Sequence, residues 1–208
     1  VWGAEKLGAL AAEDYAGEPV LHTDRPTSSH TRIHHLHTLA RYRLARGPGL
    51  EHAGTTIEWG GGFGGMARVL RRLGPPDATL VLIDLPILLA LQWAYLSTTA
   101  GPDQVHLVDE PGAGIERGRI NLVPNGLLAE IDVEPDVFLT TWALGESEPA
   151  AQDLCVGRGW LAAPHLVIAD QRTRSGGANS DRLLDLAMAH GARLEPVGTV
   201  AGSFYAFR

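Results

Sequence analysis

Lysine is nearly absent from this chain of 208 residues, in which Lys6 is the only one. Acidic residues number 24 against 17 basic ones, which leaves a formal net charge of −7. Proteins hold nucleic-acid phosphates with clustered lysine and arginine, so this balance argues against a nucleic-acid groove. We therefore expect a small-molecule substrate and no nucleic-acid partner.

The chain also has only one cysteine, Cys155, and no apolar run of the roughly 20 residues that a membrane-spanning helix needs. A single cysteine excludes a disulfide framework within the chain and suits a reducing compartment. No basic-then-apolar leader stands at its start. These absences predict a cytoplasmic protein that does not associate with membranes. The oligomeric state stays open, with a homo-oligomer among the alternatives.

What is present is enough for one globular unit, since 45% of the residues are hydrophobic and 20% are charged. Residues 1–52 read as a helical N-terminal arm or lid, and residues 53–208 as the main domain. Within the arm, residues 30–46 have helical character and are followed by Gly47-Pro48-Gly49, a strong stop signal.

The most informative segment is the glycine-rich run at residues 60–65. A strand-like stretch at residues 55–59 precedes it, and apolar residues at helical spacing follow it up to Leu73. A second apolar run then ends at Asp84. The order strand, glycine loop, helix, strand, acid predicts a nucleotide-binding βαβ unit, in which the acid accepts hydrogen bonds from a ribose diol. The alternative is that the glycines form only a flexible turn.

Two cofactor patterns overlap in this loop. Gly60, Gly62 and Gly65 satisfy the dinucleotide fingerprint, whereas Glu58, Gly60, Gly62 and Gly64 satisfy an acidic-x-G-x-G-x-G pattern. A carboxylate at position 58 would repel a pyrophosphate and would suit a ligand that carries an ammonium group. In addition, none of the tyrosines has the lysine that a Tyr-x-x-x-Lys dehydrogenase pair requires. Both observations favour S-adenosylmethionine over a nicotinamide dinucleotide.

At this point the sequence resembles a known superfamily. The motifs IEWGGGFGG at residues 57–65 and LIDLP at residues 82–86 look like the first two cofactor motifs of class I S-adenosylmethionine-dependent methyltransferases. Together with FLTTWALGE at residues 138–146, they are similar to a bacterial family of sugar O-methyltransferases over residues 30–208. The Asp/Asn-Pro-Pro-Tyr/Phe signature of many amino-group methyltransferases is absent.

The resemblance implies an α/β, Rossmann-like fold with a seven-stranded, mostly parallel sheet, a C-terminal antiparallel hairpin and the helical arm. The third strand has two candidates, residues 105–108 and 120–123. The next two strands fall at residues 136–141 and 166–169, and the hairpin at residues 193–207.

The cofactor should lie against Glu58 and the glycines on one side and against Asp84 and Leu85 on the other. The loop after the third strand is where this superfamily contacts adenine, which makes Asp109 or Asn125 the candidate. Further predicted site residues follow the fourth strand or lie in the arm. They are Thr141, Trp142, Glu146 and Arg32. Trp142 flanks the methionine arm of the cofactor or is a core residue, and Arg32 binds the cofactor's carboxylate or is merely solvated.

Methyl transfer to an oxygen usually needs a general base, and the arm contains a histidine cluster at residues 30–37. On a helix, His30, His34 and His37 share one face, with His35 beside it. The cluster provides the base, or binds a divalent metal, or is ordinary helix surface. Glu146 and Asp170 are alternative bases or metal ligands, unless they cap helices or face solvent. A metal is not favoured, because magnesium prefers carboxylates and this cluster is rich in imidazole.

The sequence therefore predicts an S-adenosylmethionine-dependent O-methyltransferase that acts on a hydroxyl of a sugar or glycosylated small metabolite, with His35, His34, His30 or Glu146 as the catalytic residue. One alternative is a cofactor-binding subunit or tailoring protein without transfer activity, which would show no histidine near the methyl group. Another is a small nicotinamide-dependent oxidoreductase.

Overall fold

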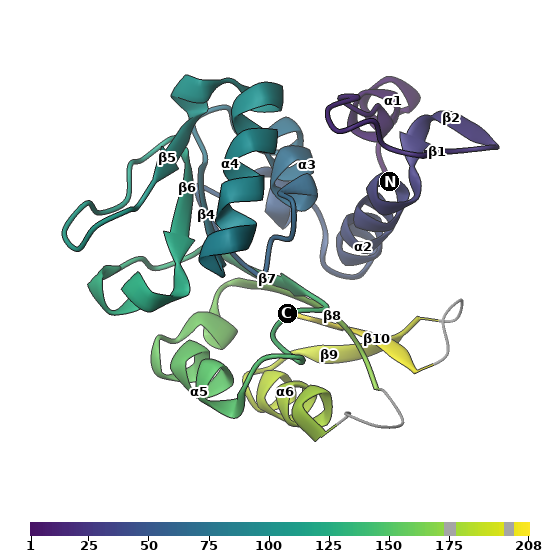
Figure 1. Ribbon diagram of the computed structural model, residues 1–208. Coiled ribbons are helices and arrows are strands. Elements are labelled where there is room, and N and C mark those ends of the chain that lie inside the picture. Colours follow the sequence, from purple (N-terminus) through teal and green to yellow (C-terminus); the bar gives the residue numbers. More distant parts are fainter. Residues whose placement is uncertain (173–177, 198–201) are drawn as a thin grey trace.

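The computed structural model describes residues 1–172, 178–197 and 202–208 (Figure 1). None of the helices in these ranges combines the length and apolarity that a bilayer crossing requires. The α-helices are α1 (Ala4–Ala11), α2 (His30–Arg46), α3 (Gly65–Leu73), α4 (Pro86–Ala100), α5 (Pro149–Gly157) and α6 (Ala178–Ala189). The strands are β1 (Leu21–His22), β2 (Arg25–Ser29), β3 (Thr55–Trp59), β4 (Thr79–Asp84), β5 (Val105–Leu107), β6 (Ile120–Pro124), β7 (Val137–Thr141), β8 (His165–Gln171), β9 (Arg193–Pro196) and β10 (Ser203–Phe207). Short 3-10 turns lie at Gly49–Glu51, Pro102–Gln104, Asn125–Glu130 and Trp160–Ala162.

One large sheet organises the molecule, with the strand order β5-β6-β4-β3-β7-β8-β10-β9. All pairs from β5 to β8 are parallel, whereas β10 is antiparallel to both of its neighbours. The expected mostly parallel sheet with a C-terminal antiparallel hairpin is confirmed. Within the described ranges the sheet has eight strands rather than seven, because both candidates for the third strand belong to it. β6 pairs with β4, and β5 adds an extra strand at the edge.

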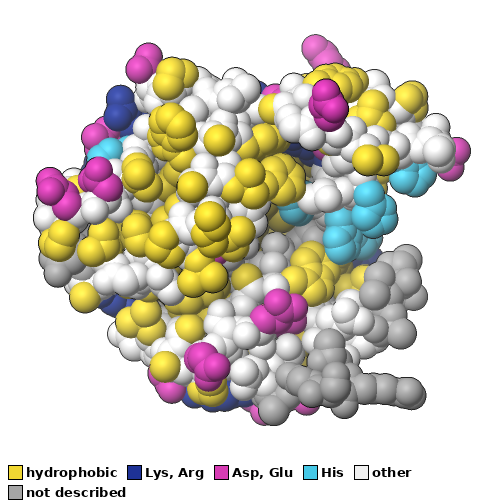
Figure 2. All heavy atoms as spheres, viewed as in Figure 1, with side chains coloured by type: hydrophobic (Ala, Val, Ile, Leu, Met, Phe, Trp, Pro, Cys, Tyr) yellow, Lys and Arg dark blue, Asp and Glu magenta, His cyan; other side chains and the backbone are white. Residues whose placement is uncertain are grey.

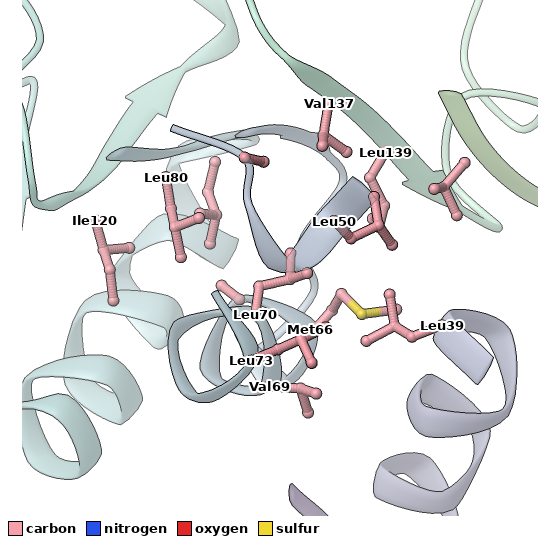
Figure 3. Close-up of a cluster of buried hydrophobic side chains, with 14 of the residues drawn as sticks. Leu39, Leu50, Met66, Val69, Leu70, Leu73, Leu80, Ile120, Val137 and Leu139 are labelled. Carbon is pink, nitrogen blue, oxygen red and sulfur yellow. The ribbon is translucent and has the colours of Figure 1, made fainter. Parts of the chain in front are cut away.

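The sheet separates two hydrophobic clusters, as the alternation of side chains along a strand requires. Leu80 and Leu82 of β4 face the cluster that α2, α3 and α4 cover, while Val81 and Ile83 face the one that α5 and α6 cover. Figure 3 shows the first cluster, with Met66 of α3 directed toward Leu39 of α2. Every residue of β4 is buried, which explains why this strand reads as a continuous apolar run.

The C-terminal hairpin closes the sheet as expected, with Phe204 opposite Pro196 and Phe207 opposite Arg193. The first strand of the hairpin is shorter than predicted, since it ends at Pro196. The remainder of that predicted strand and its turn, residues 198–201, lies outside the described residues.

The N-terminal arm packs tightly against the main domain. Leu36, Leu39 and Tyr42 of α2 are buried in the same hydrophobic cluster as the strands. The helix runs over the predicted residues 30–46 and is capped by Ser29, whose hydroxyl accepts a hydrogen bond from the Arg32 amide. The short hairpin of β1 and β2 before it was not predicted, because that stretch reads only as polar and turn-rich. The division of the chain at residue 52 stays a prediction.

A buried ion network fixes the arm to α3. Asp14 accepts hydrogen bonds from Arg32, Arg68 and Arg72, and its side chain is only 10% exposed. Glu13 pairs with the same Arg32, which is 2% exposed. Three arginines from two helices therefore converge on one carboxylate at the junction between the arm and the sheet domain.

We predict that Asp14→Ala lowers the free energy of unfolding by about 3 kcal/mol, because it leaves buried guanidinium groups without their shared partner. Glu13 still pairs with Arg32 in this variant, which keeps the loss at the low end for a buried pair. Chemical denaturation followed by circular dichroism measures it. The matched control is Asp153→Ala, since Asp153 is 66% exposed and pairs with Arg182 alone among the residues that the structure describes. Its removal should cost less than about 1 kcal/mol, and equal losses for the two variants would contradict the prediction.

Candidate functional site

The glycine loop connects the end of β3 to the start of α3, and its shape depends on two glycines in particular. Gly60 has a φ of 76°, and a Cβ at this position would lie 2.1 Å from the Cβ of Ala143. Gly64 has a φ of 95° and stands directly before α3. Both conformations are strained for residues that carry a side chain. The Gly60 amide donates to the Ile83 carbonyl at 2.9 Å, so the loop is also held by β4.

Asp84, at the end of β4, shapes this loop from the other side. Its Oδ2 accepts hydrogen bonds from the Gly62 amide at 3.2 Å and from Gln92 Nε2 at 2.8 Å. Its Oδ1 accepts from the Leu85 amide at 2.8 Å. Burial raises the pKa of Asp84, and these donors oppose the increase. With one of these donors on Oδ1 and two on Oδ2, most of the remaining acceptor capacity is on Oδ1.

Glu58 is the most perturbed group of the loop region. Its side chain is 2% exposed, and its Oε2 has no hydrogen-bond partner among the described residues. Burial, with a smaller contribution from the nearby Asp84, raises the pKa of Glu58 to about 8. A buried carboxyl oxygen without a donor is costly for the protein. Such a group is typical of a site that receives a hydrogen-bond donor or a cation from a ligand.

A cavity of about 690 Å³ opens at the carboxyl ends of the parallel strands, where α/β proteins of this kind bind ligands. Its lining includes six of the predicted site residues besides Gly60 and Gly62. They are Asp84, Leu85, Asn125, Thr141, Trp142 and Glu146. A larger hollow of about 910 Å³ lies at the opposite edge, where β3 and β4 begin at Thr55 and Thr79. That edge carries none of the predicted site residues.

The structure separates the two candidates for the adenine contact. Asn125 directly follows β6, the strand next to β4, and it lines the 690 Å³ cavity. Asp109 follows the edge strand β5 and is not part of that lining. The difference arises because β5 is the additional outer strand, so its end lies one strand further from the glycine loop.

A second cavity of about 250 Å³ adjoins the first at Gly60, Gly62, Thr141 and Trp142. Glu58 lines it together with three predicted histidines from α2, namely His30, His34 and His35. Figure 2 shows histidine side chains gathered on one side of the molecule, in the region of α2. The helical arm therefore brings imidazole groups to the same cavity as the buried carboxylate.

Trp142 forms the boundary between the two cavities. It is one of three non-glycine residues with a positive φ among the described residues, at 52°. Its indole stacks on the His34 ring, with centroids 4.6 Å apart and an interplanar angle of 26°. Trp142 thus lies at the site and also packs partly against the core, which combines the two roles considered for it.

The histidines differ in their surroundings. Burial, the nearby Arg32 and His34 together lower the pKa of His35 to about 4, and its buried Nδ1 has no partner among the described residues. Burial and the neighbouring histidines also lower the pKa of His34. Both imidazoles are therefore neutral at pH 7 and able to accept a proton. His37 is placed differently, since its Nδ1 lies 2.9 Å from the Tyr205 hydroxyl and it lines neither cavity.

Two predicted residues are engaged elsewhere. Arg32 takes part in the ion network with Glu13 and Asp14 and lines neither cavity, so it is not placed to receive a cofactor carboxylate. Asp170 is 3% exposed, and its Oδ1 accepts hydrogen bonds from the Gln171 amide and the Ser180 hydroxyl. It lies beneath Gly145 and lines neither cavity, which argues against a role as base or metal ligand. Among the described residues, no group of three or more His, Cys, Asp or Glu side chains could hold a metal ion.

Gln92 is a site residue that the sequence analysis did not find. It is fully buried on α4 and donates from Nε2 to both Asp84 Oδ2 and the Gly62 carbonyl. A signal for it does exist, because Leu89, Gln92 and Leu96 are the buried positions of α4. An amide at a core position of an otherwise apolar helix face indicates a specific polar partner.

Comparison with known proteins supports the fold. No protein-family model matches the sequence, and no curated protein matches it. Similar solved structures include precorrin-6y C5,15-methyltransferase from Geobacter metallireducens, with a TM-score of 0.53 and 15% identity over 85% of this chain. An O-methyltransferase family protein from Burkholderia thailandensis has a TM-score of 0.51 and 14% identity over 86% of it. Human N-acetylserotonin methyltransferase, solved in complex with SAM, has a TM-score of 0.52 and 13% identity over 85%.

The chain spans 86% of the length of the precorrin enzyme but only 59% and 51% of the lengths of the other two. At identities of 13–15%, the similarity shows the fold alone. This protein thus has the Rossmann-like fold of the class I methyltransferases, as the glycine loop and the acid at the end of the next strand predicted.

The raised pKa of Glu58 leads to a prediction about stability and pH. Between about pH 4.5 and pH 8, the unfolded chain loses this proton while the folded chain keeps it, so wild-type stability falls as pH rises through that window. Glu58→Gln removes this effect. In the absence of ligand, we expect the variant to melt about 5 °C above the wild type at pH 8, with a smaller difference at pH 5. Differential scanning calorimetry measures both.

The control is Glu110→Gln, which alters an exposed carboxylate in a loop. Its melting temperature should stay within about 1 °C of the wild-type value at both pH values. A Glu58→Gln variant that is less stable than the wild type at pH 8 would show that the carboxylate is charged and satisfied in the free protein.

Proposed function

We propose that this protein is an S-adenosylmethionine-dependent O-methyltransferase that acts on a hydroxyl of a sugar or a glycosylated small metabolite. The observation that carries the proposal is the pair of adjoining cavities around the glycine loop. One contains Asp84, and the other contains the histidines of α2 together with Glu58, whose Oε2 has no partner among the described residues. Methyl transfer needs residues that hold the cofactor next to a base that removes the proton of the acceptor hydroxyl.

The residues fit S-adenosylmethionine. Glu58 offers a buried acceptor for its ammonium group, and the lack of a side chain at Gly62, which has open space beside it, leaves room for the ligand against the backbone. Asp84 retains acceptor capacity at Oδ1 for a ribose hydroxyl, while Leu85 and Asn125 flank the space for the adenine. When bound, the cofactor would supply a methyl group carried on a positively charged sulfur, for transfer to an oxygen nucleophile in line with the departing sulfur.

The protein's own contribution is to hold the hydroxyl and remove its proton. His34 and His35 are neutral at pH 7 and face the 250 Å³ cavity, so either can accept a proton there. Of the two, His35 is the weaker base because its pKa is lowered to about 4. His34 also stacks on Trp142, which fixes its ring at the boundary between the cavities. Glu146 lines the cofactor side of that boundary and is exposed, which makes it the alternative base.

The histidines also bear on the alternatives. A cofactor-binding subunit without transfer activity needs no histidine beside the methyl position, whereas here three line the adjoining cavity. A dinucleotide would have to place its pyrophosphate in a cavity whose lining includes the carboxyl groups of Asp84 and Glu146 and no lysine or arginine. An oxygen acceptor is supported by the absence of the amino-group signature after β7, and a sugar acceptor by the motif at residues 138–146.

Isothermal titration calorimetry tests the cofactor. We expect S-adenosylhomocysteine to bind and NADH not to bind. At pH 7 most Glu58 carries a proton, because its pKa is about 8. A bound ammonium group would displace that proton, so binding should release about one proton and the measured enthalpy should depend on the buffer. Glu58→Gln should bind at least about tenfold more weakly and release none. Binding of NADH without a response to S-adenosylhomocysteine would refute the proposal.

Histidine variants test the base. With tritiated S-adenosylmethionine and a panel of glycosides as acceptors, we expect His34→Ala to reduce the turnover rate about 100-fold or more, while its affinity for S-adenosylhomocysteine stays unchanged. His30→Ala and His35→Ala complete the set. The matched control is His37→Ala on the same helix, which should keep a near-normal rate because His37 contacts Tyr205 instead of the cavity. Wild-type rates in all of the cavity variants would show that no histidine acts as the base.

A further inference from the structure

A third cavity continues from the histidine cavity between the N-terminal arm and α4. It has a volume of about 710 Å³ and shares His30, Thr31 and Phe63 with the 250 Å³ cavity. The arm contributes Ala16, Pro19 and Val20 to it, and α4 contributes Leu91, Ala94 and Tyr95. We refer to this third cavity as the arm groove. Because it adjoins the space beside Glu58, a ligand in the groove can reach the histidines without leaving the protein.

The arm groove is largely apolar and has no lysine or arginine in its lining. Its one carboxylate, Glu13, is already bonded to Ser29 and Arg32. Phe63 and Tyr95 meet edge to face on its wall, with ring centroids 5.0 Å apart. Val20, Leu91 and Phe63 are exposed and line the same groove, and apolar side chains exposed together in this way are typical of a ligand-binding groove. A neutral, apolar occupant would cover them, whereas a nucleotide-activated sugar would place its phosphates where no lysine or arginine faces them.

The α4 helix explains how this surface arises. It has 15 residues without a single charge, yet only Leu89, Gln92 and Leu96 of it are fully buried. Figure 2 shows hydrophobic side chains spread over the surface in the region of α4. A helix that is apolar all round normally has partners on every side. The sheet covers one side of α4, and the arm groove runs along another.

We propose that the arm groove binds the apolar aglycone of a neutral glycoside, so that the sugar hydroxyl to be methylated lies in the histidine cavity. This inference rests on the proposed function and narrows its substrate class. The acceptor is then a sugar already attached to an apolar molecule, and the protein acts after the glycosyl-transfer step that produces it. A free sugar would leave the groove empty. A sugar nucleotide would place its phosphates there without a lysine or arginine side chain to compensate their charge.

The test compares two ligands that share one sugar, 2-naphthyl β-D-glucoside and methyl β-D-glucoside, titrated into the protein saturated with S-adenosylhomocysteine. We expect the naphthyl glucoside to bind at least about tenfold more tightly, because its aromatic group buries apolar surface in the groove. Leu91→Glu and Ala94→Glu should each remove most of this difference. The matched control is Ile87→Glu, which adds the same charge one turn earlier on α4 at a residue that is 75% exposed and outside the groove lining.

Each outcome bears on the proposal. Equal affinity for the two glucosides, or no binding of the naphthyl glucoside by protein that does bind S-adenosylhomocysteine, would overturn the arm groove assignment and leave the proposed function standing. If Ile87→Glu removes the affinity difference between the two glucosides to the same extent, the assignment is overturned too. That result would place the ligand on the general surface of α4. Failure of S-adenosylhomocysteine to bind at all would instead refute the proposed function. Melting temperatures close to the wild-type value show that the three glutamate variants are folded.

Discussion

The burial of a carboxyl group at Glu58 is the constraint on which the rest of the site depends. Parallel pairing sets Glu58 beside Leu82 of β4, so its side chain lies in the interior near the end of two central strands. In the part of the chain that the structure describes, no lysine or arginine lines the cavity beside it, and its Oε2 has no hydrogen-bond donor. The protein tolerates this group as a proton-bearing acid instead of a salt bridge, which keeps it available to a ligand.

The charged groups at the junction between the arm and the sheet, unlike Glu58, each have one or more charged partners. There Asp14 gathers three arginines, and Arg32 is held by two carboxylates. This network aligns the start of α2, and the histidines project from that first part of the helix. The stability of the junction and the position of the imidazole groups are thus linked through a single buried residue, Arg32. The helix that carries the proposed catalytic histidines is thus held firmly in place. This matters because small displacements of reacting groups greatly reduce reaction rates.

Much of the fold could be predicted from the sequence because its central signals are local. The strand before the glycine loop, the helix after it and Asp84 lie within about 30 residues, and each carries its own periodicity or turn chemistry. The bounds of α2 were clear for the same reason, since a glycine-proline stop follows it. The additional strand β5 was ambiguous because a three-residue edge strand has too few positions to show a pattern.

The site was harder to predict, because its residues meet only through tertiary contacts. Arg32 reads as a free cation in the sequence, and its partners Glu13 and Asp14 lie almost 20 residues away in a segment without regular structure. Asp109 and Asn125 are equivalent as turn residues until the strand order separates them. Gln92 has a local signal, but its partner Asp84 becomes evident only when α4 is packed on the sheet. Local patterns therefore predict the elements, while the pairing of charges between elements needs the fold.

Trp142 shows what the site costs the protein. A left-handed backbone conformation is about 1 kcal/mol or more unfavourable for a residue with a side chain, and glycine would adopt it freely. The chain is rich in glycine and places one at 12 other described positions with a positive φ, yet here it has its bulkiest side chain. In this conformation, directly after β7, the indole stacks on the His34 ring. A glycine at position 142 would relieve this conformation, but it would also remove the indole that stacks on His34 and packs partly against the core.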